Sequence, residues 1–182
     1  MRLAVTGLFA IVVGLLLASD AYSCSVYRTR PFSSAEMVAE ADAIVLANAE
    51  GYAPGPRTSR SSSPLPDSNV RFRIIEVIRA KLPMISALAE NGYLVLPGTL
   101  IDQDDFNDHP APYTFVRPEG RRGNCYATTY RSGAQFLLML KRNSTGDLTV
   151  YWNPLAPVNE QVHPSEDAWV LWVRKEIRQL DK

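Results

Sequence analysis

The chain has 182 residues, of which 46% are hydrophobic and 21% are charged. Its 19 basic residues balance its 19 acidic residues, which argues against nucleic acid or an anionic membrane as a dominant partner. The length is typical of one domain with a sizeable core.

The first 23 residues have the pattern of a cleaved export signal. Arg2 supplies a positive charge, and residues 3–18 form an uncharged apolar run. Small residues at alternate positions then place the cleavage site after Ala21 or after Ser23. We therefore expect a secreted or periplasmic, and in either case extracytoplasmic, protein.

Two other interpretations of this N-terminus are less favoured. The apolar run is shorter than the roughly 20 residues that span a bilayer, which argues against a membrane anchor. Ala21 and the bulky Tyr22 fit poorly before a lipidated cysteine. We expect a single domain over residues 24–182, without a membrane span in the mature chain. Export also favours one disulfide between the two cysteines of the chain.

The mature chain begins with a predicted helix and strand. Residues 33–43 predict a short helix, capped by Ser33 or Ser34. Residues 43–52 then predict a first strand. Residues 53–69 are rich in Pro and Ser and carry two arginines, which indicates a mobile loop. The buried face of the helix is expected to contain Met37, Val38 and Ala41.

A second and a third strand are predicted next. In residues 70–79 apolar and basic residues alternate, but the phase slips by one at Ile74–Ile75, which indicates a β-bulge. Residues 81–90 are ambiguous and fit a short helix after Pro83. A third strand is predicted over residues 93–96.

A long irregular insert is expected over residues 99–124, followed by more strands. Residues 126–130 predict a short strand, and residues 134–142 predict a buried one. A turn at residues 143–146 and a strand at residues 148–152 complete a hairpin.

The chain ends in a predicted amphipathic helix over residues 168–180, capped by Ser165. Its expected core-facing stripe is Trp169, Trp172, Val173, Ile177 and Leu180. Together the elements predict a mainly β protein. We expect a small closed antiparallel β-barrel with a short N-terminal helix and a C-terminal helix.

No cofactor or catalytic motif is present, so we expect no cofactor and no enzymatic activity. Residues 101–109 hold four aspartates, but their spacing fails the calcium-loop template, because Phe106 and Tyr113 stand where ligands are required. We expect no metal site there. The acidic loop is expected to pair with three basic residues of the same insert, Arg117, Arg121 and Arg122.

The order of these landmarks resembles a known family. The landmarks are a cysteine after the signal, the Ala41–Val45 opening of strand one, the strand at 70–81, Cys125, and the pattern Tyr130-x-x-Gly133-x-x-Phe136-Leu137-Leu138. This order resembles the netrin-like module of the tissue inhibitors of metalloproteinases, whose fold is an oligonucleotide/oligosaccharide-binding (OB) type barrel.

The resemblance implies a Cys24–Cys125 disulfide and a secreted, non-enzymatic binding module that inhibits a metalloprotease. It places the partner at the N-terminal edge, residues 24–27, and at residues 55–66 of the loop rich in Pro, Ser and Arg, the Pro/Ser/Arg loop. Zinc chelation by a Cys24 amine would require cleavage after Ser23. The alternative function is an envelope structural or assembly protein that acts through protein contacts. The expected partner-binding residues are Cys24, Ser25, Val26, Tyr27, Arg57 and Arg60.

Overall fold

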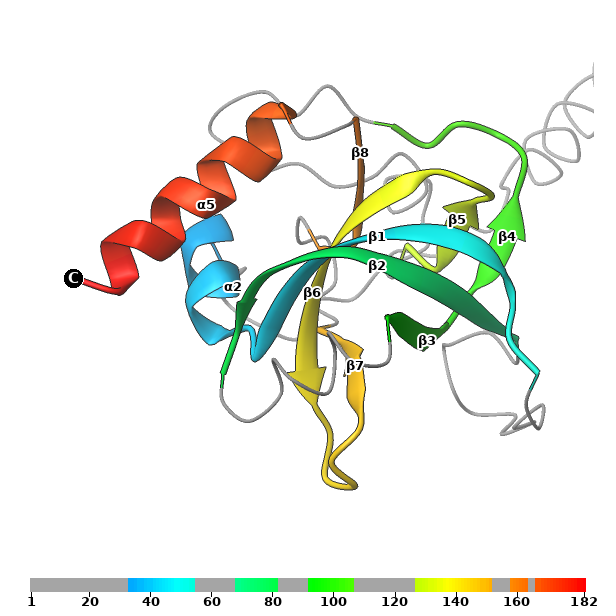
Figure 1. Cartoon of the computed structure of the whole chain (residues 1–182), viewed down its shortest axis with the longest axis horizontal. Coiled ribbons are helices and arrows are strands. Elements are labelled where there is room, and N and C mark those ends of the chain that lie inside the picture. The colour runs from blue at the N-terminus through cyan, green and yellow to red at the C-terminus, as the bar shows by residue number, and fades with distance from the viewer. Residues whose placement is uncertain (1–32, 55–67, 82–91, 107–126, 152–157, 164–165) are drawn as a thin grey trace, which may run out of the picture.

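The computed structural model describes residues 33–54, 68–81, 92–106, 127–151, 158–163 and 166–182 (Figure 1). These residues are mainly β. They form two helices, α2 (Ser34–Glu40) and α5 (Ala168–Leu180). The strands are β1 (Ala43–Tyr52), β2 (Asn69–Ala80), β3 (Tyr93–Pro97), β4 (Thr99–Ile101), β5 (Thr129–Arg131), β6 (Gln135–Arg142), β7 (Leu148–Val150) and β8 (Glu160–Val162). Within the described ranges, no helix is both long enough and apolar enough to cross a membrane.

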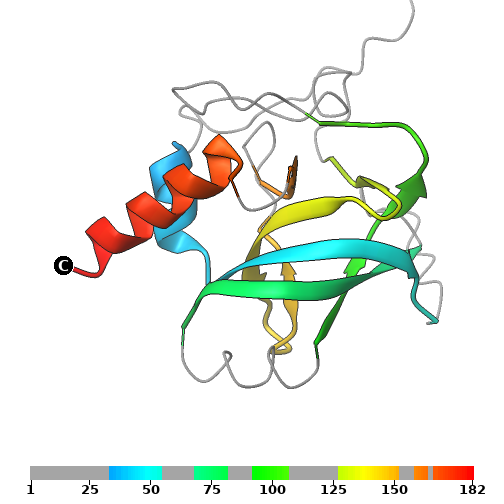
Figure 2. The ribbon, with the colours of Figure 1, turned by 45° about the horizontal axis from the view of Figure 1, so that its top comes forward.

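The strands form one large antiparallel sheet and one small parallel sheet. The large sheet has the order β3-β2-β1-β6-β7, and β8 also pairs with β6. The small sheet consists of β4 and β5. Figures 1 and 2 show β1 and β2 curving together across the middle of the molecule. Neither sheet closes on itself among the described strands.

Strand β2 contains the bulge that the sequence predicts. Leu46 of β1 pairs with Glu76, whereas the next residue, Ala47, pairs with Ile74. Ile75 is therefore the additional residue, and the side chains of β2 change phase at this point. The first half of β2 sends Val70 and Phe72 into the core, where both are fully buried.

The core is built from residues of both helices and both sheets, and it includes a cluster of three aromatic rings. Phe72 and Tyr130 meet edge to face with ring centroids 4.8 Å apart, and Tyr130 meets Phe136 in the same way at 5.1 Å. All three side chains are fully buried. Edge-to-face pairs add about 0.5–1.5 kcal/mol beyond their buried area, so this cluster joins β2, β5 and β6 firmly.

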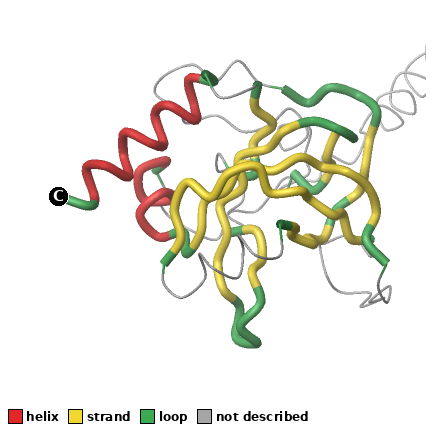
Figure 3. The backbone as a smooth tube through the Cα atoms, in the orientation of Figure 1, coloured by secondary structure: helices red, strands yellow, loops and turns green. Residues whose placement is uncertain are grey.

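The two helices lie side by side at one end of the sheet (Figure 3). Ser33 caps α2 in a capping box with Glu36. The sequence predicts Ser33 or Ser34 as the cap, so the first alternative is confirmed. The cap of α5 is Asp167, which accepts a hydrogen bond from the backbone of Trp169, so the predicted Ser165 cap is wrong. Within the predicted stripe Trp169 is fully buried, but Leu180 is 49% exposed because α5 extends past the sheet.

The predicted hairpin between β6 and β7 is confirmed. Asn143 Oδ1 accepts hydrogen bonds from the backbone nitrogens of Thr145, at 3.0 Å, and Asp147, at 2.9 Å. Gly146 has φ of +94°, which disfavours any residue with a side chain. The Asn and the Gly of this turn therefore have backbone roles.

Three short strands differ from the prediction. The sequence predicts an irregular segment at residues 99–101, but these residues form β4, and no sequence pattern predicts β8. The strand predicted at residues 126–130 is β5, displaced toward the C-terminus. The helix considered after Pro83 and most of the Pro/Ser/Arg loop lie outside the described residues.

Candidate binding surface

Strand β2 presents two arginines on the outward face of the sheet. Because Val70 and Phe72 point into the core, the alternating Arg71 and Arg73 must point outward. The antiparallel register places Val95 of β3 opposite Arg71 and Tyr93 opposite Arg73. Residues that are directly opposite share a face, so these four side chains lie together.

Glu50 of β1 forms ion pairs with both arginines. Its Oε1 lies 2.7 Å from Nε of Arg73, and its Oε2 lies 3.7 Å from an Nη of Arg71. The guanidinium of Arg71 also lies over the ring of Tyr93, 5.1 Å from its centroid. Exposed ion pairs contribute only about 0–1 kcal/mol to stability. Their main effect here is to orient the two guanidinium groups.

The same region exposes several large apolar side chains. Tyr93 is 45% exposed, Val95 is 52% exposed, and Ile75 at the bulge is 46% exposed. We call Glu50, Arg71, Arg73, Ile75, Tyr93 and Val95 the outer patch. Arginine and aromatic residues are enriched at the centres of protein–protein interfaces, and the outer patch combines both.

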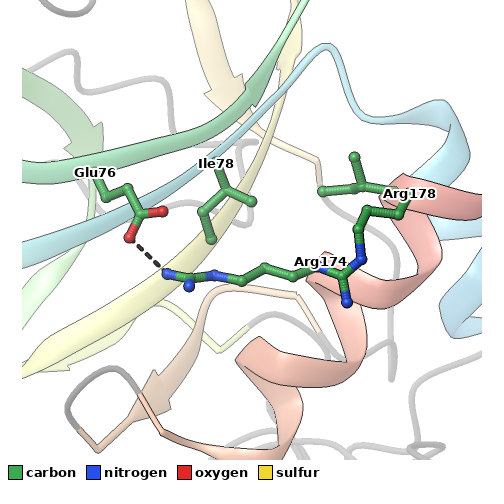
Figure 4. Close-up of a pocket in the computed structure, with 5 residues that line it drawn as sticks. Glu76, Ile78, Arg174 and Arg178 are labelled. Atoms are coloured by element: carbon green, nitrogen blue, oxygen red, sulfur yellow. Dashed lines mark hydrogen bonds and ion pairs between the residues drawn. The ribbon is translucent and has the colours of Figure 1, made fainter. Parts of the chain in front are cut away.

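A groove lies farther along β2, between that strand and α5 (Figure 4). Its volume is about 230 Å³. An ion pair with a distance of 2.6 Å between Arg174 Nη2 and Glu76 Oε2 crosses it. Figure 4 shows Glu76 and Ile78 projecting from β2 toward the arginines of α5. The lining residues are Glu76, Ile78, Arg174, Ile177 and Arg178.

The described part of the acidic loop contacts β8 and β5. Asp104 accepts a hydrogen bond from Nε2 of Gln161, which is the main reason why the pKa of Asp104 is lowered. Its Oδ1 also lies 3.4 Å from an Nη of Arg131. The backbone N–H of Asp105 donates to Oε1 of Gln161 at 3.3 Å, and Asp105 is buried. The loop is thus attached to the body of the protein.

This loop forms no metal centre in the portion that is described. No group of three or more His, Cys, Asp or Glu side chains that could hold a metal ion occurs among the described residues. The expected ion pairs with Arg117, Arg121 and Arg122 lie outside the described residues.

The site residues predicted from the sequence also lie outside the described residues. These residues are Cys24, Ser25, Val26, Tyr27, Arg57, Arg60 and Cys125. The predicted disulfide and N-terminal contact surface therefore stay predictions. The alternation of Arg71 and Arg73 with apolar residues predicts a strand, but it does not predict the outer patch or the groove.

Comparison with models of protein families found no family that matches this chain. Comparison with curated proteins found no matching protein. The resemblance to the netrin-like module thus rests on the residues of this chain alone.

Proposed function

We propose that this chain is an exported, non-enzymatic binding module that contacts a protein partner through the outer patch. The observation that carries the proposal is the arrangement of Arg71 and Arg73 beside Tyr93, with all three side chains about half exposed. Glu50 orients both arginines before any partner binds. A pre-oriented side chain loses less conformational entropy on binding, which favours affinity.

The proposal includes an OB-type barrel as the finer fold. Strand β3 continues through Gly98 into β4, and β5 continues through Gly133 into β6. Because β4 pairs with β5, this pairing links the two ends of the path β3-β2-β1-β6. Gly133 has φ of +77°, which supports the predicted bend at this corner.

A secreted metalloprotease is the first partner class to test, because the chain resembles the netrin-like module of metalloproteinase inhibitors. The N-terminal edge at residues 24–27, tied by a Cys24–Cys125 disulfide, would extend the contact surface in this case. An envelope assembly partner is the alternative. Inhibition assays against secreted metalloproteases, run beside capture from envelope extracts, separate the two classes.

The role of the outer patch is tested with the double variant Arg73→Ser/Tyr93→Ser. Both side chains are about half exposed, so the fold should persist, which a thermal unfolding scan would check. We expect the dissociation constant for the purified partner, measured by calorimetry, to rise by about 30-fold or more, as for an interface hot spot.

The matched control is Leu171→Ser, which changes an equally exposed apolar side chain on α5. We expect this variant to bind as the wild type does. Unchanged affinity of the double variant would contradict the proposed surface, as would an equal loss in both variants.

A further inference from the structure

The groove between β2 and α5 contains more positive charge than its single acid neutralises. Arg174 and Arg178 both line it, whereas Glu76 is the only acidic residue among the described residues that line it. Glu76 pairs with Arg174 at 2.6 Å. Arg178 is exposed, and it forms no hydrogen bond or ion pair with any residue of the described ranges.

Arg174 also has unused hydrogen-bonding capacity. Its Nη2 donates to Glu76 and its Nε is buried, whereas its Nη1 is neither buried nor paired with a described residue. A guanidinium has five N–H donors in a planar fork, which suits a carboxylate. The two arginines lie one helical turn apart on α5, so their side chains project from the same face of the helix.

The rest of the groove is apolar and small. Ile78 and Ile177 line it, and Ile177 is only 8% exposed. The volume of about 230 Å³ is below the roughly 300–1,000 Å³ of sites for small molecules. The groove therefore fits one side chain or one chain terminus better than a cofactor.

Building on the proposed binding function, we propose that this groove binds a carboxylate of the protein partner. The carboxylate pairs with Arg178 and with Nη1 of Arg174. The aliphatic part of the same residue packs on Ile78 and Ile177. The ligand is thus an acidic side chain or a C-terminal carboxylate next to aliphatic carbon, and charge complementarity selects it.

The groove is tested with 4-methylpentanoate, a small aliphatic carboxylate, by NMR titration of the full mature chain labelled at isoleucine methyls. We expect saturable shifts at Ile78 and Ile177, with a dissociation constant on the order of millimolar for so small a probe. The neutral 4-methylpentanamide should cause no saturable shift. Absence of saturation with the acid, or equal shifts with the amide, would overturn the inference.

Two charge variants test the role of Arg178 in carboxylate binding. Arg178→Gln should weaken binding of 4-methylpentanoate at least fivefold. Lys175→Gln removes a positive charge from an exposed residue of the same helix that does not line the groove, and should change binding less than twofold. Equal losses in both variants would indicate non-specific charge attraction and would overturn the assignment.

The double variant Arg73→Ser/Tyr93→Ser separates this inference from the proposed function. It should bind 4-methylpentanoate normally, because the groove is lined by other residues. If Arg178→Gln binds the purified partner with unchanged affinity while the double variant does not, the groove inference fails and the outer patch stands. Failure of the double variant to weaken partner binding would count against the proposed surface alone.

Discussion

Among the described glycines, Gly98 is the one at which packing leaves no room for a side chain. A Cβ at this position would lie 2.7 Å from Cδ2 of Tyr130 and 3.0 Å from the carbonyl oxygen of Thr128. The ring of Tyr130 has no room to move, because it is fully buried against Phe72 and Phe136. We expect Gly98→Ala to lower the free energy of unfolding by about 1–3 kcal/mol, measured by urea denaturation.

Gly51 provides the matched control for this prediction. It is also a strand glycine, but no atom lies within 4 Å of a Cβ built there. Gly51→Ala should leave stability unchanged or raise it by up to about 1 kcal/mol, since alanine reduces the entropy of the unfolded chain. Equal destabilisation by the two substitutions would contradict the packing explanation.

Asp42 joins the ends of three strands at the base of the sheet. Its Oδ2 accepts a hydrogen bond from the backbone N–H of Arg142 at 2.9 Å, and its Oδ1 accepts one from Nζ of Lys81 at 3.1 Å. Its backbone carbonyl accepts from the N–H of Lys81 at 2.9 Å. The hydrogen bond from Arg142 is the main reason that the pKa of Asp42 lies below its usual value of 3.8, and Lys81 lowers it further.

This pKa shift makes a predictable contribution to stability. The unfolded chain has the higher pKa, so it takes up the proton first as the pH falls. The contribution is therefore complete well above pH 3.8 and is lost as the pH falls through the lower pKa of the folded state. We expect Asp42→Asn to cost about 1 kcal/mol at pH 7, with the deficit shrinking in acid.

Urea midpoints measured between pH 7 and pH 2 check this prediction. Asp102→Asn is the control, because it removes one negative charge from an exposed residue of the acidic loop. Its stability should follow that of the wild type across the range. A constant difference between Asp42→Asn and the wild type at all pH values would contradict the linkage.

At the scale of elements, α5 depends on the cap at its first turn. Asp167 Oδ1 accepts a hydrogen bond from the N–H of Trp169 at 2.8 Å, and its Oδ2 accepts one from the N–H of His163 at 3.2 Å. Loss of an acidic cap typically costs about 0.5–2 kcal/mol. We expect Asp167→Ala to reach the upper part of that range, because Asp167 is buried and also fixes the end of β8.

The neighbouring Glu166 is the control for the cap. It is exposed and precedes the helix, so Glu166→Ala should change the free energy of unfolding by less than about 0.5 kcal/mol. Thermal and urea unfolding of both variants would decide whether Asp167 caps α5. If Glu166→Ala lowered the free energy of unfolding more than Asp167→Ala, Asp167 would not be the residue that caps α5.

The long elements could be predicted from sequence, whereas the short ones could not. Strands β1, β2 and β6 and helix α5 each have enough residues for a period to appear, and the bulge at Ile75 is visible as a change of phase. Strands β4 and β8 have three residues each. In β8, Glu160 and Gln161 are buried polar residues, and burial of such residues follows from tertiary contacts that no local pattern encodes.

The candidate site was harder to predict than the fold because it is made by register and packing. Arg73 and Tyr93 are adjacent only because β2 and β3 pair in one particular register. The groove joins Glu76 to Arg174, which are 98 residues apart in the chain. Alternating arginines in a strand indicate a charged outward face. They do not indicate which residues of the neighbouring strand lie opposite them.

At the scale of the whole molecule, both helices and the large sheet share one core. Trp169 of α5, Met37 of α2 and Ile44 of β1 are fully buried in the same cluster. Polar contacts add to this attachment, because Glu40 at the end of α2 pairs with Lys141 of β6 at 3.3 Å and Arg79 of β2 donates to the carbonyl of Val38 at 3.0 Å. The helices should not unfold separately from the sheet.

We therefore expect one cooperative unfolding transition, which the tryptophans can test. The chain has three tryptophans, and Trp169 stacks on Trp172 with ring centroids 5.1 Å apart. In a Trp152→Phe variant both remaining tryptophans lie in α5, so tryptophan fluorescence reports on that helix, whereas the far-ultraviolet circular dichroism reports on the strands as well. The two urea transitions should coincide in midpoint and slope, as two-state unfolding requires. A fluorescence midpoint at lower urea would mean that α5 detaches first, and the groove on its inner side could then open and close without loss of the sheet.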